Sequence, residues 1–184
     1  MGDSPADTMV SEIMTGADIG RALRRIGHEI VESHPSLRDL VLVGVHTRGA
    51  HLADRIATFL AELSGSIVAV GHLDIGRYRD DASIRPVRRG RPTTVPRPLD
   101  GRSLIVVDDV LYTGRTMRAA MGALVEMGRA RETELAVLVD RGHRELPIRP
   151  DYVGKNIPTS HEEHVAVRLT EEDGMDTVWI ERQS

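Results

Sequence analysis

Two adjacent aspartates, Asp108 and Asp109, separate an apolar run from a turn of small and hydroxyl-bearing residues. Residues 104–116 read LIVVDDVLYTGRT, which predicts a buried strand that leads through a turn into a helix. Ligands of parallel α/β sheets bind outside the carboxyl ends of the strands, so both carboxylates lie where a substrate would be held. The segment 112–116 (YTGRT) opens the helix, and its backbone N–H groups and threonine hydroxyls are suited to bind a phosphate.

A pair of carboxylates beside an anion-binding turn suits a ligand that carries hydroxyl groups next to a phosphate. An ionised carboxylate only accepts hydrogen bonds, and a ribose diol offers the matching donors. The stretch therefore predicts a ribose 5-phosphate site. A second interpretation stays open, in which one aspartate caps the helix and the other binds a cation or solvent. The Gly-Lys-Ser/Thr of a Walker A loop and the GxGxxG of a dinucleotide site are both absent from the sequence.

The composition indicates one α/β domain rather than a membrane or secreted protein. With 184 residues, of which 40% are hydrophobic, the chain is long enough for one sizeable core, and we expect a single domain over 1–184. The net charge of -4 gives no general sign of a nucleic-acid or membrane partner, so an RNA site must be a local patch. The sequence has no cysteine, which excludes thiolate metal sites, and no apparent signal peptide. We expect a cytoplasmic location without membrane contact.

Strand and helix patterns alternate through the middle of the chain, which predicts a mostly parallel sheet covered by helices on both faces. The expected helices cover 18–33, 50–63 and 113–127, and the expected strands lie within 40–49, 66–73, 104–108 and 134–139. Asp18 is placed to cap the first helix. That helix also carries a basic stripe, which is either an ordinary solvated face or part of an anion-binding surface.

Three segments fall outside this alternation. Residues 1–15 are polar and small at the start, and we expect a mobile N-terminus there. Residues 76–101 hold many arginines and four prolines, which in a single domain favours a functional lid over a linker. The residues beyond Asp140 resemble an appended subdomain of loops and short strands.

The string VVDDVLYTGRT (106–116) resembles the phosphoribosyl pyrophosphate (PRPP) signature of type I phosphoribosyltransferases. The strings VGVHTRGAHLADRIA, YRDD, LAVLVDRGHRELPIR and DYVGKNIPTS are similar to a narrower group, the PyrR family of bifunctional pyrimidine-operon regulators and uracil phosphoribosyltransferases. The resemblance covers about residues 15–182. It implies the type I phosphoribosyltransferase fold, with a flexible lid loop at 74–98 and a small hood subdomain with C-terminal strands at 140–184.

The resemblance also implies a set of substrate-binding residues. Asp108, Asp109 and Arg48 are the implied catalytic residues, with the aspartates on the ribose hydroxyls and Arg48 on pyrophosphate. Surface exposure remains the alternative for Arg48, and a plain turn remains the alternative for Gly154. The full set implied to bind PRPP or UMP is Thr47, Arg48, Arg79, Arg85, Asp108, Asp109, Val110, Leu111, Tyr112, Thr113, Gly114, Arg115, Thr116, Arg141, Val153, Gly154 and Asn156.

The implied reaction displaces pyrophosphate from PRPP by a uracil nitrogen and gives UMP. Mg²⁺ is the implied cofactor, carried by PRPP or pyrophosphate rather than held directly by protein ligands. Relatives of this kind are dimers or higher oligomers, so we expect a homo-oligomer. A purine or orotate phosphoribosyltransferase is disfavoured by the VGKNIPTS string.

The second implied function is UMP-dependent binding to the leader mRNA of pyrimidine genes. The positions that match RNA-contacting residues are Arg25, His28, His143, Arg144, Arg149, Lys155 and Thr159. We add the neighbouring Arg24 to this expected RNA-binding set. A pure RNA-binding regulator that senses pyrimidines with negligible turnover remains the alternative. The sequence departs from the usual family pattern at Gly76, Arg77, Arg24 and Gly27, and Gly27 costs about 1 kcal/mol of helix propensity relative to alanine.

Overall fold

A parallel five-stranded sheet forms the centre of the protein. The computed structural model describes residues 9–78 and 90–182. The strand order is β3-β2-β4-β5-β6, and every neighbouring pair is parallel. The strands are β2 (Leu40–Val45), β3 (Ala69–Leu73), β4 (Ser103–Leu111), β5 (Glu132–Asp140) and β6 (Tyr152–Asn156). The expected parallel sheet is confirmed.

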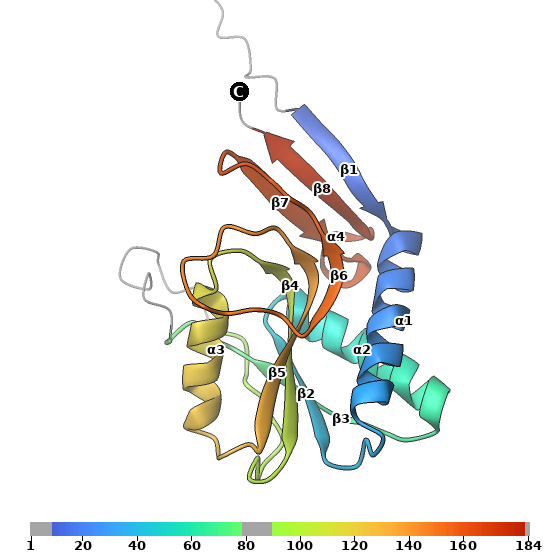
Figure 1. Ribbon diagram of the computed structural model, residues 1–184, viewed down its shortest axis with the longest axis vertical. Coiled ribbons are helices and arrows are strands. Elements are labelled where there is room, and N and C mark those ends of the chain that lie inside the picture. The colour runs from blue at the N-terminus through green and yellow to red at the C-terminus, as the bar shows by residue number, and fades with distance from the viewer. Residues whose placement is uncertain (1–8, 79–89, 183–184) are drawn as a thin grey trace, which may run out of the picture.

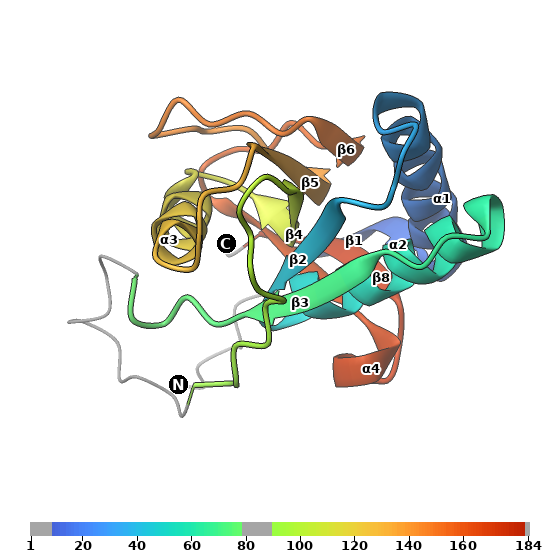
Figure 2. The ribbon, with the colours of Figure 1, turned by 90° about the horizontal axis from the view of Figure 1, so that it is seen from below.

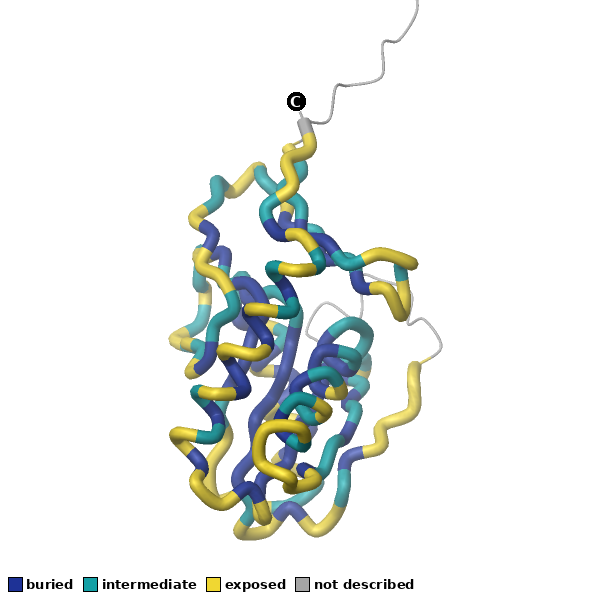
Figure 3. Tube along the Cα trace, turned by 90° about the vertical axis from the view of Figure 1, so that its right-hand side faces the viewer, coloured by how far each residue is buried: buried dark blue, intermediate teal, exposed yellow. Residues whose placement is uncertain are grey.

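Helices cover both faces of this sheet, as Figures 1 and 2 show. Helices α1 (Gly16–Ser33) and α2 (Arg48–Ser64) lie on one face, and α3 (Arg115–Val125) lies on the other. Alternate residues of one strand therefore enter different layers of the core: Ile105 packs with the α1 and α2 side, whereas Val106 packs with the α3 side. Figure 3 shows the resulting buried interior beneath helices whose outer turns are exposed.

A second, antiparallel sheet forms the hood above the carboxyl ends of the central strands. It has the order β1-β8-β7, with β1 (Met9–Thr15), β7 (Glu163–Arg168) and β8 (Thr177–Arg182). The short helix α4 (Thr170–Asp173) connects β7 to β8.

The N-terminal part of the hood corrects the expected mobile segment at 1–15. Met9–Thr15 form β1 because they pair with the edge of β8, and Met14 is buried there. The remaining residues of that segment, 1–8, lie outside the described residues. The expected hood boundary also shifts, because β6 falls within 140–184 yet belongs to the central sheet.

Helix α1 begins with a capping box rather than with a cap from Asp18 alone. Thr15 is the N-cap residue and accepts a hydrogen bond from the Asp18 N–H, while the Asp18 carboxylate accepts from the Thr15 N–H at 2.9 Å. Asp18 is therefore the N3 residue of the box. The hydrogen bonds from Thr15 lower the pKa of Asp18 to about 2.

The end of the expected lid at 74–98 lies against the edge of β3. The Thr94 N–H donates to the His72 carbonyl at 2.8 Å, and the His72 N–H donates to the Thr94 hydroxyl. Val95 is buried at the same edge. We call residues 90–98 the lid return. Arg79 and Arg85, which are expected to close over pyrophosphate, lie outside the described residues.

Gly27 allows α1 and α2 to approach each other. A Cβ atom at this position would lie 2.4 Å from the Phe59 ring, whose partner on α1 is the His28 ring at 5.3 Å between centroids. The departure from alanine at position 27 is thus explained by the bulk of Phe59 on α2. The helix loses intrinsic propensity here and gains a close interhelical contact.

Substituting Gly27 with alanine should therefore destabilise the protein. Alanine gains about 1 kcal/mol of helix propensity, but overpacking against Phe59 costs about 1 to 3 kcal/mol, so we expect a net loss of about 1 kcal/mol. Gly20→Ala in the same helix is the matched control, since a Cβ there meets nothing within 4 Å. Gly20→Ala should raise the free energy of unfolding, which urea denaturation measures for both variants. Equal stabilisation by both substitutions would contradict the role given to Phe59.

Candidate functional site

Close backbone contact places the start of α2 against β4. A Cβ atom at Gly49 would lie 2.4 Å from the Val107 carbonyl oxygen and 3.0 Å from the Asp108 Cα atom. A Cβ atom at Gly44 would lie 2.4 Å from the Ala50 Cα atom. Both positions therefore need glycine, and the α2 N-terminus lies directly beside the first aspartate of the pair.

The two aspartates lie near the carboxyl end of β4 and differ in exposure. Asp108 is buried, and its Oδ1 accepts a hydrogen bond from the Asp109 N–H at 3.0 Å. Asp109 is half-buried, and its Oδ1 accepts from the Val110 N–H at 2.9 Å. These bonds fix both carboxylates relative to the backbone of β4. The expected strand ends at 108, whereas β4 continues to Leu111.

The turn after β4 is held from outside by the segment that follows β5. The carbonyl of Tyr112 accepts from Arg144, and the carbonyl of Thr113 accepts from the N–H groups of Glu145 and Leu146 at 3.0 and 3.1 Å. Gly114 is the N-cap residue of α3 with φ of 93°, a left-handed conformation that favours glycine. The carbonyls of the turn thus point toward this flanking segment, and the first N–H groups of α3 have no intrahelical acceptor.

Arg48 begins α2 and forms a two-bonded ion pair with Asp173 of α4. The Arg48 Nε donates to Asp173 Oδ2 at 3.1 Å, and Nη2 donates to Oδ1 at 2.8 Å. These hydrogen bonds raise the pKa of Arg48, and the negative charge of Asp109 contributes in the same direction. Arg48 therefore lies within electrostatic reach of Asp109. Thr47, the N-cap residue, makes no side-chain capping bond within the described chain, so its hydroxyl can face a ligand.

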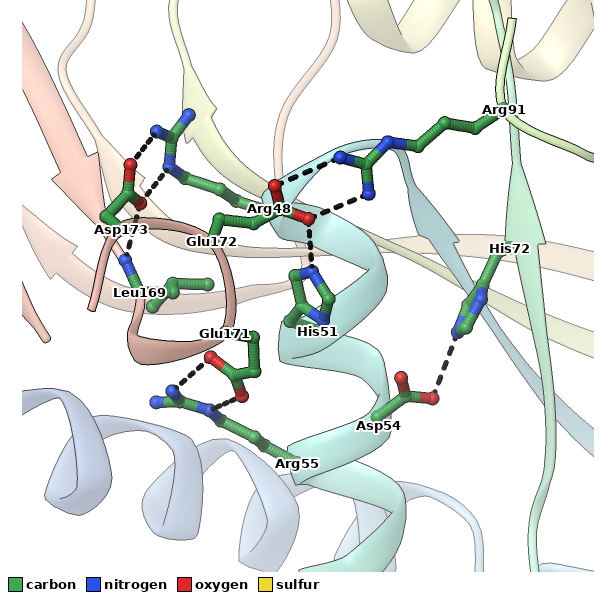
Figure 4. A network of polar contacts seen from close by, with 10 residues as sticks. All are labelled: Arg48, His51, Asp54, Arg55, His72, Arg91, Leu169, Glu171, Glu172 and Asp173. Carbon is green, nitrogen blue, oxygen red and sulfur yellow. Dashed lines mark hydrogen bonds and ion pairs between the residues drawn. The ribbon is translucent and has the colours of Figure 1, made fainter. Parts of the chain in front are cut away.

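The rest of α4 binds the same face of α2, as Figure 4 shows. Glu171 pairs with Arg55, and Glu172 accepts from both His51 and Arg91 of the lid return, at 2.9 and 2.7 Å. Arg55 also forms an ion pair with Asp176 at 2.8 Å. We call the four acidic residues of this network, Glu171, Glu172, Asp173 and Asp176, the hood carboxylates.

The β6 residues expected to read uracil are placed differently from one another. Val153 pairs with Val137, in the same row of the sheet as Asp108, whereas Asn156 pairs with Asp140 at the carboxyl edge. Gly154 lies within β6 rather than in a turn. A Cβ atom at this position would lie 2.4 Å from the Leu138 carbonyl oxygen.

The guanidinium of Arg25 covers the outer side of β6. Its Nη2 donates to the carbonyls of Val153 and Gly154 at 2.7 and 2.8 Å. A uracil N–H would have to compete with Arg25 for these two acceptors. Asn156, which is exposed, has no such competitor within the described residues.

Arg141 is buried rather than open to a ligand. Its guanidinium lies 4.0 Å from the centroid of the Tyr112 ring and donates to the Thr159 hydroxyl and the Ser160 carbonyl. The side chain therefore links the turn after β4 to the segment after β6. Its expected approach to the base or the phosphates remains a prediction.

The positions expected to bind RNA form two groups. Arg24, Arg25 and His28 lie on the exposed side of α1, and the exposed Lys155 of β6 donates from Nζ to the Ile13 carbonyl at 3.0 Å, just before that helix. The α1 positions and Lys155 therefore share one region.

The second group lies in the loops after β5 and β6. Arg144 donates to Asp140 and to backbone carbonyls of its own loop, and His143 contacts His161 and the Thr159 carbonyl. Arg149 is exposed, with no contact to another side chain within the described residues. Among the residues that the structure describes, no hydrogen bond or ion pair joins this second group to α1.

Comparisons with known proteins agree with this architecture. A phosphoribosyl transferase domain family matches residues 9–172. The bifunctional protein PyrR of Chloroflexus aurantiacus is 53% identical over 174 residues, which cover 94% of this chain and 96% of that protein. The bifunctional protein PyrR of Thermus aquaticus is 56% identical over 171 residues, 91% of this chain and 93% of that protein. The chain belongs to the PyrR family.

A solved structure confirms the fold expected of a PyrR family member. The hypoxanthine phosphoribosyltransferase of Trypanosoma cruzi superimposes with a TM-score of 0.72 at 17% identity, covering 95% of this chain and 97% of that one. At this identity the likeness concerns the fold alone. In the described parts of this PyrR family chain, no helix is long and apolar enough to cross a membrane.

Two residues near the start of α2, Asp173 and His46, were not predicted from the sequence as part of the site. Asp173 contacts Arg48 across 125 positions of sequence, and the only local signal is the acidic run before Gly174 opposite a basic stripe at 48, 51 and 55. His46 directly follows β2, contacts the Pro92 carbonyl of the lid return through Nε2, and has a buried Nδ1 without a partner among described residues. Burial lowers the pKa of His46.

Acid should weaken the contact between the hood and α2. The hydrogen bonds from Arg55 lower the pKa of Asp176 from its ordinary 3.8 to about 2. A carboxyl whose pKa is lowered by folding stabilises the folded protein at a pH above its ordinary pKa. This stabilisation disappears as the pH falls toward the pKa of the folded state. Asp176→Asn should cost about 1 to 2 kcal/mol of unfolding free energy at pH 7. Urea unfolding should show the difference shrinking below about pH 4; a constant difference down to pH 2.5 would contradict the assignment.

Proposed function

We propose that this chain transfers the phosphoribosyl group of PRPP to uracil, giving UMP and pyrophosphate, and that it regulates pyrimidine genes by UMP-dependent binding to their leader mRNA. One observation carries the enzymatic part. The close approach of α2 to β4 sets the start of α2, where Arg48 lies, beside the Asp108–Asp109 pair, and the turn at 112–116 follows that pair along the chain. These three groups match the three parts of the donor.

Each part of PRPP has a chemically suitable partner in this arrangement. The carboxylates of Asp108 and Asp109 accept hydrogen bonds from the ribose hydroxyls. The start of α3 binds the 5-phosphate through N–H groups, since helix N-termini favour anions. Arg48 and Thr47 bind the pyrophosphate, where a guanidinium supplies charge and paired donors.

The reaction forms a bond from a uracil nitrogen to the anomeric carbon of ribose and breaks the bond from that carbon to pyrophosphate. The nitrogen loses its proton, and the bonding electron pair leaves with pyrophosphate. The ribose becomes cationic in the transition state, and the charges of Asp108 and Asp109 favour it. Arg48 favours the growing negative charge of the leaving group.

Mg²⁺ would arrive with PRPP rather than be held directly by protein ligands. When bound to the pyrophosphate, Mg²⁺ neutralises the leaving group. The protein side chains then position the ribose and the base rather than the metal.

Asn156 is the β6 residue best placed to meet uracil. It lies at the carboxyl edge of the sheet in the same row as Leu111, which follows the aspartate pair on β4. An amide side chain offers both a donor and an acceptor, which matches the alternating groups of the uracil edge.

Substituting Asp109 with asparagine should abolish UMP formation while the fold is kept. The measurement is product formation from labelled uracil, PRPP and Mg²⁺, with urea unfolding as the check on stability. We expect a loss of at least about 100-fold, because both ribose hydrogen bonding and charge stabilisation are weakened. Asp39→Asn, on an exposed turn at the opposite end of the sheet, is the control and should retain activity. Wild-type protein that binds PRPP but makes no UMP would leave only the regulatory function.

Arg24 and Arg149 are the sharpest probes of RNA binding. Both are exposed, and neither contacts another side chain within the described residues, whereas Arg25 and Lys155 also hold β6 and β1. Arg24→Ala and Arg149→Ala should each weaken binding of pyrimidine leader RNA in the presence of UMP and reduce the salt slope by about 1. Arg38→Ala, before β2, is the charge-matched control. Unchanged affinity and salt slope for both variants would remove these residues from the RNA site.

A further inference from the structure

The contact between Arg48 and Asp173 joins the proposed pyrophosphate residue to the hood. Two parallel hydrogen bonds, at 3.1 and 2.8 Å, connect the guanidinium to both carboxylate oxygens. This two-bonded geometry fixes the plane of the guanidinium as well as its distance from the carboxylate. Arg48 thus has one defined orientation before any ligand arrives.

Asp173 is itself held firmly in place. Its Oδ2 also accepts a hydrogen bond from the Leu169 N–H at 2.9 Å, and its own N–H donates to the Leu169 carbonyl. The two preceding residues of α4 anchor the same helix to α2 through Arg55 and His51. The carboxylate is therefore presented from a short helix that is attached at several points.

The ion pair uses one edge of the guanidinium and leaves the other directed away from Asp173. Nε and Nη2 contact the carboxylate, while the second terminal nitrogen of Arg48 points away from it in Figure 4. An arginine has five N–H donors, so it can bind a carboxylate on one edge and an anion on the other. The negative charge of Asp109 also acts on Arg48.

We propose that Asp173 is a positioning residue that orients Arg48 for the pyrophosphate of PRPP. This inference rests on the proposed function, because it assigns pyrophosphate to Arg48. A free arginine side chain loses rotamer entropy when it is ordered. Asp173 orders Arg48 during folding, so the ligand meets a side chain that is already in place.

Charge repulsion acts in the opposite direction to this positioning role. The hood carboxylates place negative charge beside a site for a polyanion, which by itself would weaken binding. Removing Asp173 therefore has two opposite effects: it relieves repulsion of PRPP and it releases Arg48. The proposal requires the loss of orientation to dominate, so the sign of the measured change decides it.

The test compares two ligands that share the ribose 5-phosphate and differ in pyrophosphate. Calorimetric titrations with PRPP and Mg²⁺, and separately with UMP, are made on wild-type protein and on Asp173→Asn. We expect the Kd for PRPP to rise about tenfold and the Kd for UMP to stay within about twofold. Asp173→Glu, which keeps the charge and both acceptor oxygens, should recover part of the PRPP affinity.

Glu171→Gln is the matched control for Asp173→Asn. It lies on the same helix and removes one negative charge, but its partner is Arg55, which keeps its pair with Asp176. Its PRPP affinity should stay close to wild type. If Glu171→Gln weakens PRPP binding as much as Asp173→Asn does, the effect comes from the hood in general and the inference is overturned.

The remaining outcomes separate this inference from the proposed function. Tighter or unchanged PRPP binding by Asp173→Asn overturns the positioning role, and so does equal weakening of PRPP and UMP, which would indicate general damage to the site. Wild-type protein that binds PRPP without forming UMP overturns the transferase proposal and leaves the positioning role intact. Wild-type protein that fails to bind PRPP overturns both.

Discussion

The backbone of α2 must lie against the backbone of β4 for this site to exist. Gly49 permits that approach, and Gly44 lets the start of α2 lie against β2, because a Cβ at either position would overlap main-chain atoms. Main chain is harder to displace than the end of a flexible side chain, so the constraint is strict. It brings the start of α2, and with it Arg48, to the first of the two aspartates. The hood is then attached to the exposed face of the same helix, and the lid return is attached to the hood.

Arginine side chains and hood carboxylates are closely paired beside α2. The overall charge is -4, and Arg48 places a cation at the proposed pyrophosphate position, paired with Asp173. The hood carboxylates neutralise these cations in the unliganded protein, and the lowered pKa of Asp173 beside Arg48 keeps that carboxyl ionised. Since partly buried cations are costly without partners, the same acids that hold the hood on α2 also make an anion site compatible with folding.

The features that depend on short stretches of sequence were predictable, and those that depend on distant partners were not. The apolar run before Asp108 and the turn after it identify a strand, a helix start and a ligand position, and the parallel sheet follows from alternation. Strand β1 has no comparable signal: Val10 is half exposed, and its partner β8 lies at the other end of the chain. The ion pair of Arg48 likewise depends on a residue 125 positions away.

The basic face of α1 divides into residues with different physical roles. Arg25 donates to two carbonyls of β6, the edge strand, and so satisfies groups that would otherwise be unpaired at a sheet edge. Lys155 similarly joins β6 to Ile13 of β1. Neighbouring Arg24 points to solvent on the same helix. Helical spacing alone does not distinguish Arg24 from Arg25. The contacts show that Arg25 stabilises the fold, whereas Arg24 is available to a phosphate backbone. Substituting a basic residue that points to solvent, such as Arg24, should therefore weaken RNA binding without disturbing the β6 strand that carries Asn156.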